Sequence, residues 1–204
     1  MSDKSLSQEK INNLILLYKK GLIKEALVEA EQLIENNPNS FFLHNIHGMI
    51  NINLKKWNKS IESLSKAIEI KQDYAEAHNN LGVALNNLAH LEKAIESYSN
   101  AIKFKPDYAN AHNNLGSVFN DLGRWEEALE SYSKALEYNP ENNEAYENLI
   151  KLLTFYKPKK ANSNSIVIAN QELQNIKYNY NSNKKITDNE ISNFFKKCNK
   201  IILK

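Results

Sequence analysis

Apolar residues recur along most of the chain at the three- and four-residue spacing of amphipathic helices, and this pattern itself repeats. Residues 75–108 begin AEAHNNLGVALNNL and residues 109–142 begin ANAHNNLGSVFNDL. Both segments continue through Ala-x-Glu-Ser-Tyr-Ser-x-Ala to a proline, and 17 of their 34 positions are identical without a gap. A period of this length is typical of stacked units of two helices joined by a turn.

The repeat extends beyond these two segments. Two weaker units precede them at residues 7–40 and 41–74, and residues 143–156 match only the first helix of a unit. Leu14 stands where the other units have glycine, and Ser60 stands where alanine is expected. We therefore predict four units and a helix at residues 143–156 that caps the array, because the ends of repeat arrays need a polar outer face.

The pattern of small and large residues resembles the tetratricopeptide repeat (TPR) family. Its signature positions in the third and fourth units are Leu81, Gly82, Leu85, Ala94, Tyr98, Ala101 and Pro106, then Leu115, Gly116, Phe119, Ala128, Tyr132, Ala135 and Pro140, with Gly123 at the turn between helices. The resemblance implies an all-α fold, a right-handed superhelical solenoid of helix–turn–helix repeats with a concave groove lined mainly by the first helix of each pair. Small residues let paired helices approach closely, and the large residues fill the space between units.

The last quarter of the chain departs from the repeat. Residues 157–186 are rich in Asn, Ser and Lys, so we expect a partly disordered linker. Residues 187–190 form a capping box that predicts a helix over residues 187–204. The apolar residues on one face of this helix are Ile191, Phe194, Phe195, Cys198, Ile201 and Ile202. Either it docks on the array or it begins a further domain.

Composition and charge narrow the class of protein. The net charge is +2, divided into −5 over residues 1–156 and +7 over residues 157–204, so the repeats do not form a nucleic-acid surface. No apolar run approaches the roughly 20 residues of a membrane-spanning helix. The N-terminus lacks the features of a secretory signal. A single cysteine, Cys198, fits a reducing compartment, and we expect a cytoplasmic protein.

Residues with catalytic or metal-binding chemistry form no familiar constellation. There is no glycine-rich phosphate loop and no zinc spacing, so we expect neither an enzyme nor a cofactor or metal site. His44, His78 and His112 recur every 34 residues and are interpreted as packing residues. Trp57 and Trp125, at the start of second helices, are expected in the core.

Asparagines mark the predicted groove. Asn12, Asn80, Asn114 and Asn148 share one position of the first helix, interrupted only by Ile46. This set, the asparagine ladder, resembles the ladder in the repeat arm of O-linked N-acetylglucosamine transferases, which holds the backbone of a substrate. A carboxamide offers both a donor and an acceptor, so it can pair with any peptide unit. The asparagines expected to widen this polar lining are Asn45, Asn79, Asn86, Asn113 and Asn120.

A second interpretation of the ladder stays open, namely family consensus in an asparagine-rich chain with no ligand selected. Chaperone-tail binders of this family clamp a terminal carboxylate with cationic residues. The corresponding positions here are Asn45, Asn79 and Asn113, so the resemblance predicts no such clamp. We expect the ladder amides to face solvent in the empty groove.

The predicted function is that of a non-catalytic protein–protein interaction scaffold, which binds an extended peptide or partner protein in the concave groove. The alternative is the substrate-recruiting arm of a group-transferase similar to the glycosyltransferases, with its catalytic part beyond residue 204 or on another chain.

Overall fold

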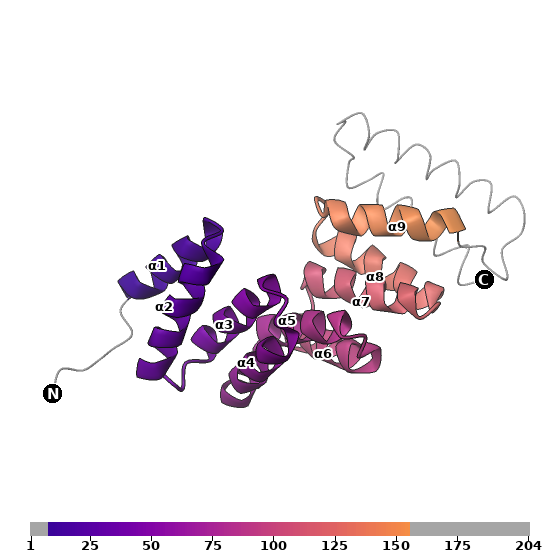
Figure 1. Cartoon of the computed structure of the whole chain (residues 1–204). Helices are drawn as coiled ribbons and strands as arrows, with labels where there is room; N and C mark the ends of the chain where they lie inside the picture. The colour runs from indigo at the N-terminus through magenta and orange to yellow at the C-terminus, as the bar shows by residue number, and fades with distance from the viewer. Residues whose placement is uncertain (1–7, 156–204) are drawn as a thin grey trace, which may run out of the picture. The chain divides into compact units, whose positions relative to one another are not determined.

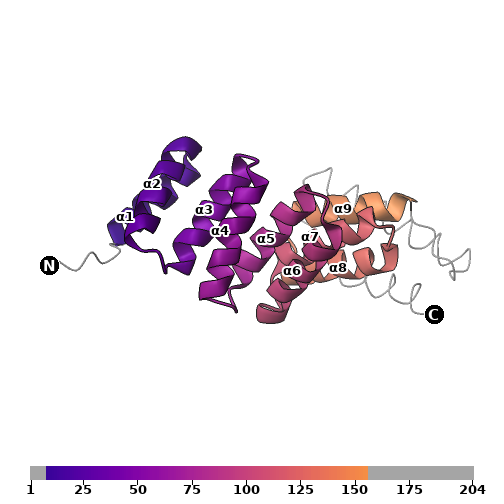
Figure 2. The same cartoon turned by 60° about the horizontal axis from the view of Figure 1, so that its bottom comes forward.

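The structure is a computed structural model that describes residues 8–155, and these residues form nine helices and no strand (Figures 1 and 2). The helices are α1 (Gln8–Lys19), α2 (Ile23–Asn36), α3 (Phe41–Asn53), α4 (Trp57–Ile70), α5 (Ala75–Asn87), α6 (Leu91–Phe104), α7 (Ala109–Asp121), α8 (Trp125–Tyr138) and α9 (Asn143–Phe155). This confirms the predicted all-α fold. The predicted linker at 157–186 and the helix at 187–204 lie outside the described residues. No described helix has both the length and the apolar character needed to cross a membrane.

The described helices fall into two compact units, α1 to α6 and α7 to α9. In the first unit each helix from α1 to α6 packs on its neighbours in sequence, and α3 also packs on α5. In the second unit α8 packs on α7 and α9, and α7 also contacts α9. First helices therefore lie beside first helices within each unit, which brings side chains about one repeat apart into contact.

A left-handed residue ends the first helix of every pair at the same point of the repeat. Gly21 and Gly123 have φ angles of 74° and 68°, and Lys55 and Ala89, at the equivalent positions, have 55° and 57°. In each turn the next amide bonds back to a carbonyl five residues earlier, as Arg124 N does to Phe119 O at 2.8 Å. This is the Schellman arrangement, which glycine adopts without a steric penalty and other residues do not.

Glycine lets a large residue of the second helix enter each of the two strongest repeats. A Cβ atom on Gly82 would lie 2.6 Å from the ring of Tyr98, and one on Gly116 would lie 2.8 Å from the ring of Tyr132. Both tyrosines are buried, and burial raises the pKa of Tyr132 to about 12. The predicted close approach of the paired helices at the small signature residues is therefore confirmed, and the tyrosines, expected between units, pack inside their own unit.

The two weaker repeats fill the same space with other residues. In the second repeat Gly48 faces Leu64, and a Cβ there would lie 2.5 Å from the leucine Cγ. In the first repeat the sizes are reversed, since Leu14 occupies the glycine position and Ala30 the tyrosine position. Both are fully buried in one core cluster. A large residue thus fills this space once per repeat, from either helix.

Residues at the expected alanine positions confirm the close contact of paired helices. Ala94 and Ala128 have no exposed surface. Ser60 replaces alanine in the second repeat, and its Oγ donates a 3.0 Å hydrogen bond to the buried carbonyl of Gly48. The prediction for the tryptophans was wrong at Trp125, which is 44% exposed. It is the first residue of α8.

Candidate functional site

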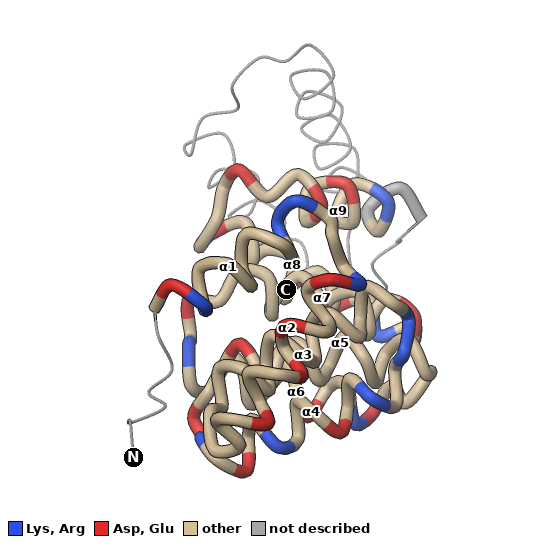
Figure 3. The backbone as a smooth tube through the Cα atoms, turned by 60° about the vertical axis from the view of Figure 1, so that its left-hand side comes forward, with Lys and Arg blue, Asp and Glu red and all other residues tan. Residues whose placement is uncertain are grey.

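All nine predicted site residues lie on the first helices of the repeats. They are Asn12 on α1, Asn45 on α3, Asn79, Asn80 and Asn86 on α5, Asn113, Asn114 and Asn120 on α7, and Asn148 on α9. Three of these helices carry few charges (Figure 3): α3 has no charged residue, α5 only Glu76 and α7 only Asp121.

Three of these asparagines are buried. Asn45, Asn79 and Asn113, the second row, have exposed fractions of 4%, 6% and 2%. They were expected to widen the polar lining of an open groove, and the structure instead buries their side chains. Buried carboxamides need hydrogen-bond partners inside the protein, because an unpaired polar group costs about 1–3 kcal/mol. For Asn45 and Asn113, a partner lies on the neighbouring repeat of the same unit.

The ladder asparagine of one repeat bonds to the second-row asparagine of the repeat before it. Asn80 Nδ2 donates to Asn45 Oδ1 at 2.9 Å in the first unit. Asn148 Nδ2 donates to Asn113 Oδ1 at 3.1 Å in the second unit. Both pairs are 35 residues apart in sequence and join first helices of adjacent repeats. The ladder amides were expected to face solvent. Asn80 and Asn148 are instead half-buried, and each is hydrogen-bonded to a buried asparagine.

Each paired ladder amide keeps part of its hydrogen-bonding capacity. A carboxamide has two N–H donors and two acceptor lone pairs. Asn80 uses one N–H on Asn45, and its Oδ1 accepts from Asn79 Nδ2 at 3.4 Å. One donor and one lone pair of Asn80 are not used by any hydrogen bond that the structure describes. The amide therefore has one donor and one acceptor for a ligand, the pattern of a peptide unit.

The other predicted site residues differ from these pairs. Asn12 is exposed, and its Oδ1 accepts a 3.0 Å hydrogen bond from Gln8 on its own helix. Asn120 is exposed and Asn86 is half-buried. The sequence placed all nine on first helices, and the structure separates them into buried, half-buried and exposed residues.

An aromatic residue missed by the sequence interpretation completes the Asn45 network. Asn45 Nδ2 donates to the Tyr74 hydroxyl at 3.5 Å. Tyr74 packs edge-on against Phe41, with ring centres 4.9 Å apart, and Lys71 Nζ lies 4.9 Å from the Phe41 ring centre. Burial raises the pKa of the Tyr74 hydroxyl, and the nearby Glu76 carboxylate adds to the effect. Tyr74 is the residue before α5, and its position at the end of a repeat was the only available signal.

The recurrent histidines pack against aromatic or carbonyl groups, as predicted. His78 is buried, its Nε2 lies 2.9 Å from Gln72 O, and its ring is 5.4 Å from that of Phe104. His112 is also buried, 5.4 Å from the Tyr138 ring. Within residues 8–155, no three His, Cys, Asp or Glu side chains lie close enough to hold a metal ion.

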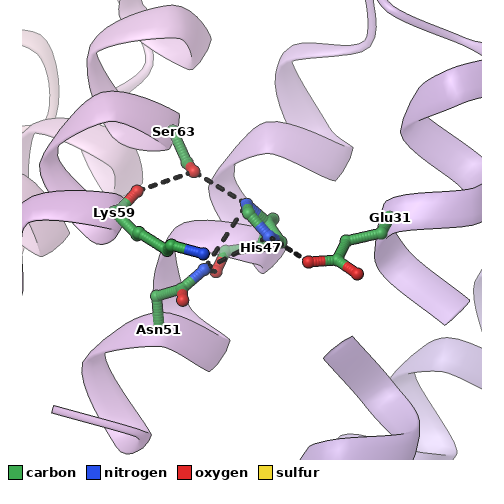
Figure 4. Close-up of polar contacts among 5 residues, drawn as sticks. All are labelled: Glu31, His47, Asn51, Lys59 and Ser63. Carbon is green, nitrogen blue, oxygen red and sulfur yellow. Dashed lines mark hydrogen bonds and ion pairs between the residues drawn. The ribbon is translucent and has the colours of Figure 1, made fainter. Parts of the chain in front are cut away.

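A different histidine lies in a cluster with serine and glutamate (Figure 4). His47 Nδ1 is 2.7 Å from Ser63 Oγ, and His47 Nε2 is 3.8 Å from a Glu31 carboxylate oxygen. Ser63 Oγ also donates to Lys59 O at 2.9 Å, so its one proton is committed to that carbonyl. His47 must then donate from Nδ1 to the serine oxygen. In this arrangement the imidazole does not act as the base that activates a serine nucleophile.

The cluster is instead a polar contact among α2, α3 and α4. Asn51 is fully buried and its Nδ2 lies 3.2 Å from His47 Nε2, while its Oδ1 has no partner among the described residues. Desolvation lowers the pKa of His47 below its ordinary value, outweighing the attraction of Glu31. The sequence contained a sign of this cluster, because the third repeat has Leu81 and Leu85 at the positions of His47 and Asn51.

Comparisons with known proteins agree with this architecture. The family model described as "Tetratricopeptide repeat" matches residues 109–142, and the model described as "TPR repeat" matches residues 50–88 and 90–120. Among curated proteins, none matches the chain significantly.

Solved structures of similar fold include two that were described with peptides. The crystal structure of MamA is 22% identical with a TM-score of 0.61, covering 89% of this chain and 89% of that one. YrrB, described as a TPR protein with an unusual peptide-binding site, is 18% identical with a TM-score of 0.59, covering 75% and 79%. The first TPR of Spaghetti (RPAP3), bound to the HSP90 peptide SRMEEVD, is 22% identical with a TM-score of 0.54, covering 56% and 90%. At these identities the likeness shows the helical repeat fold alone.

Proposed function

Because the chain is a tetratricopeptide repeat protein, we propose that it is a non-catalytic scaffold that binds an extended peptide, or an extended segment of a partner protein, through its asparagine ladder. The observation that carries this proposal is the state of Asn80. Its amide is half-buried and oriented by Asn45 and Asn79, yet one donor and one acceptor remain for a ligand. Asn148 repeats the pairing with Asn113 in the second unit.

The chemistry of this face favours the backbone of a ligand over its side chains. The amides of Asn80 and Asn148 can each give one hydrogen bond to a peptide carbonyl and accept one from a peptide N–H. Helix α3 is uncharged and α5 has Glu76 alone, so a charged side chain of the ligand finds little complementary charge. The ladder hydrogen bonds to such a peptide would therefore go to its backbone.

A clamp for a terminal carboxylate has little support on this face. Such a clamp needs cations at the second-row positions, and the residues there are asparagines. Asn45 and Asn113 are buried and already bonded to the next repeat. The HSP90 peptide bound to the first TPR of Spaghetti and the peptide site named for YrrB show that this fold accommodates peptides in those proteins. They support peptide binding in general and no particular ligand.

Selection from a phage-displayed library of random dodecapeptides tests the proposal, followed by fluorescence anisotropy with one selected peptide. The variant that combines Asn80→Ala with Asn114→Ala should bind about five- to 150-fold more weakly, since each lost hydrogen bond contributes roughly 0.5–1.5 kcal/mol. Its free energy of unfolding should also fall by about 1–3 kcal/mol, because Asn45 Oδ1 loses its donor.

The matched control removes the same side chains from second helices. Asn58 on α4 is exposed and Asn100 on α6 is half-buried, and neither is on a first helix. Asn58→Ala with Asn100→Ala should leave the affinity unchanged. Binding that survives loss of Asn80 and Asn114 in the folded protein, or a library from which no peptide is enriched, contradicts the proposal.

A further inference from the structure

We propose that the second-row asparagines Asn45 and Asn113 are positioning residues that orient the ladder amides of Asn80 and Asn148 for a peptide backbone. This inference rests on the proposed function and deepens it. It separates residues that touch the peptide from residues that act through them, and it sets where the peptide site begins along the chain.

Burial and bonding place Asn45 beneath the site. Its side chain is 4% exposed, too little for direct contact with a ligand of the ladder. Its Nδ2 donates to the Tyr74 hydroxyl at 3.5 Å and lies 3.8 Å from Met49 Sδ, so its Oδ1 points to the donor of Asn80 at 2.9 Å. The neighbouring groups thus determine which end of the Asn45 amide is oxygen, and that oxygen determines which end of the Asn80 amide is nitrogen.

The chain contains an internal comparison for this pairing. The residues at the second-row position and at the ladder position of the next repeat, 35 residues on, are Asn45 and Asn80, Asn79 and Asn114, and Asn113 and Asn148. At the first junction both residues are apolar, because Ile11 stands at the second-row position and Ile46 at the ladder position. Amide is matched with amide and isoleucine with isoleucine, as expected if the two positions form one structural unit.

Asn12 is the ladder residue that lacks this support. Its repeat is the first one described, it is exposed, and its Oδ1 is bonded to Gln8 on its own helix. An exposed asparagine keeps its rotamer freedom and loses it on binding, which costs affinity. The positioning inferred here therefore applies to Asn80 in the first unit and to Asn148 in the second and not to Asn12, although all three share one position in the repeat.

Preorganisation is the physical reason why a buried residue would affect peptide affinity. An amide held by one hydrogen bond presents its second N–H and its oxygen in a fixed order, so its torsion angles need not be ordered when the peptide binds. The same fixed order favours one direction of the peptide chain, since reversal exchanges the donors and acceptors it offers.

A mutant cycle on peptide affinity tests positioning by Asn45. With the selected dodecapeptide, Asn45→Leu should raise Kd about two- to tenfold, in the range of one hydrogen bond or less. In a protein that already has Asn80→Ala, the same change should leave Kd unaltered, because the amide it orients is absent. Asn45→Asp, which keeps an acceptor for Asn80 Nδ2, should restore most of the affinity, and Asn12→Ala should have no effect.

Several results would overturn the inference. Equal affinity of Asn45→Leu and the parent protein would show that the second row does not position the ladder. An equal loss with and without Asn80 would make Asn45 merely structural. A loss of peptide affinity for Asn12→Ala as large as that for Asn80→Ala would show that Asn12 belongs to the site.

Stability measurements separate this inference from the proposed function. Asn45→Ile and Asn80→Ile each leave a polar group of the pair without its partner. The double variant has isoleucine at both positions, as the first junction does with Ile11 and Ile46. The double variant should therefore be more stable than the sum of the single changes predicts. Additive losses overturn the pair itself, whatever the peptide does. If the two changes are strongly coupled in stability but the protein binds no peptide, the asparagine pair is real, and both the proposed function and the positioning role are wrong.

Discussion

The reversed sizes in the first repeat provide a test of what holds a repeat together. In the third repeat Gly82 lies under Tyr98, whereas the first repeat has Leu14 and Ala30 at the same two positions. Exchanging the sizes in the third repeat requires Gly82→Leu and Tyr98→Ala. If the two helices need only one large residue between them, either helix can supply it.

The structure sets the magnitude of each single change. A Cβ on Gly82 would lie 2.6–2.8 Å from three atoms of the Tyr98 ring, against about 3.5–4.0 Å for carbon atoms in good contact. The ring is 1% exposed and has nowhere to move, so Gly82→Leu should cost about 3 kcal/mol, near the upper end for overpacking. Tyr98→Ala leaves a cavity in place of the ring and should cost about 3–5 kcal/mol.

The combined variant distinguishes complementarity from simple addition. Independent effects would sum to about 6–8 kcal/mol, whereas a leucine that fills the space of the lost ring should reduce the total to about 1–3 kcal/mol. Urea unfolding followed by circular dichroism measures all three variants. Gly21→Ala is the control, because nothing lies within 4 Å of a Cβ added there. The stability cost of this change comes only from the φ of +74°. A double variant less stable than either single one refutes the reasoning.

Three further predictions concern the turns, the histidine cluster and the alanine contacts. Ala89→Gly should raise the free energy of unfolding by about 0.5–1 kcal/mol, because Ala89 has a φ of 57° where Gly123 stands one repeat later; an unchanged urea midpoint contradicts this. Stability should fall as the pH drops below about 6.5, because the unfolded chain binds a proton at His47 more readily than the folded one does, and His47→Leu should reduce this dependence in urea titrations at a series of pH values. Ala128→Leu should cost about 1–3 kcal/mol, since Ala128 has no exposed surface, and an unchanged thermal midpoint would show that the close helix contact is misplaced.

The sequence by itself determined the features that depend on neighbours along the chain. Amphipathic spacing predicted the helices, and the 34-residue period predicted that α3, α5, α7 and α9 begin at equivalent residues. Glycine predicted the turn at Gly123, because only glycine adopts a left-handed conformation without a steric cost. The repeat identified Gly82 and Tyr98 as a small and a large signature residue of one unit. Such features are set within a helix or a single helical pair.

Only the tertiary structure decided how one repeat meets the next. Asn45 and Asn80 look alike in the sequence, yet one is buried and the other is half-buried, because a side chain's burial depends on the helix packed beside it. The contact of His47 with Ser63 and Glu31 joins three helices, and the sequence carried only the replacement of leucine as a sign of it. Periodicity assigns a residue to a face of its own helix, and packing in three dimensions decides which partner covers that face.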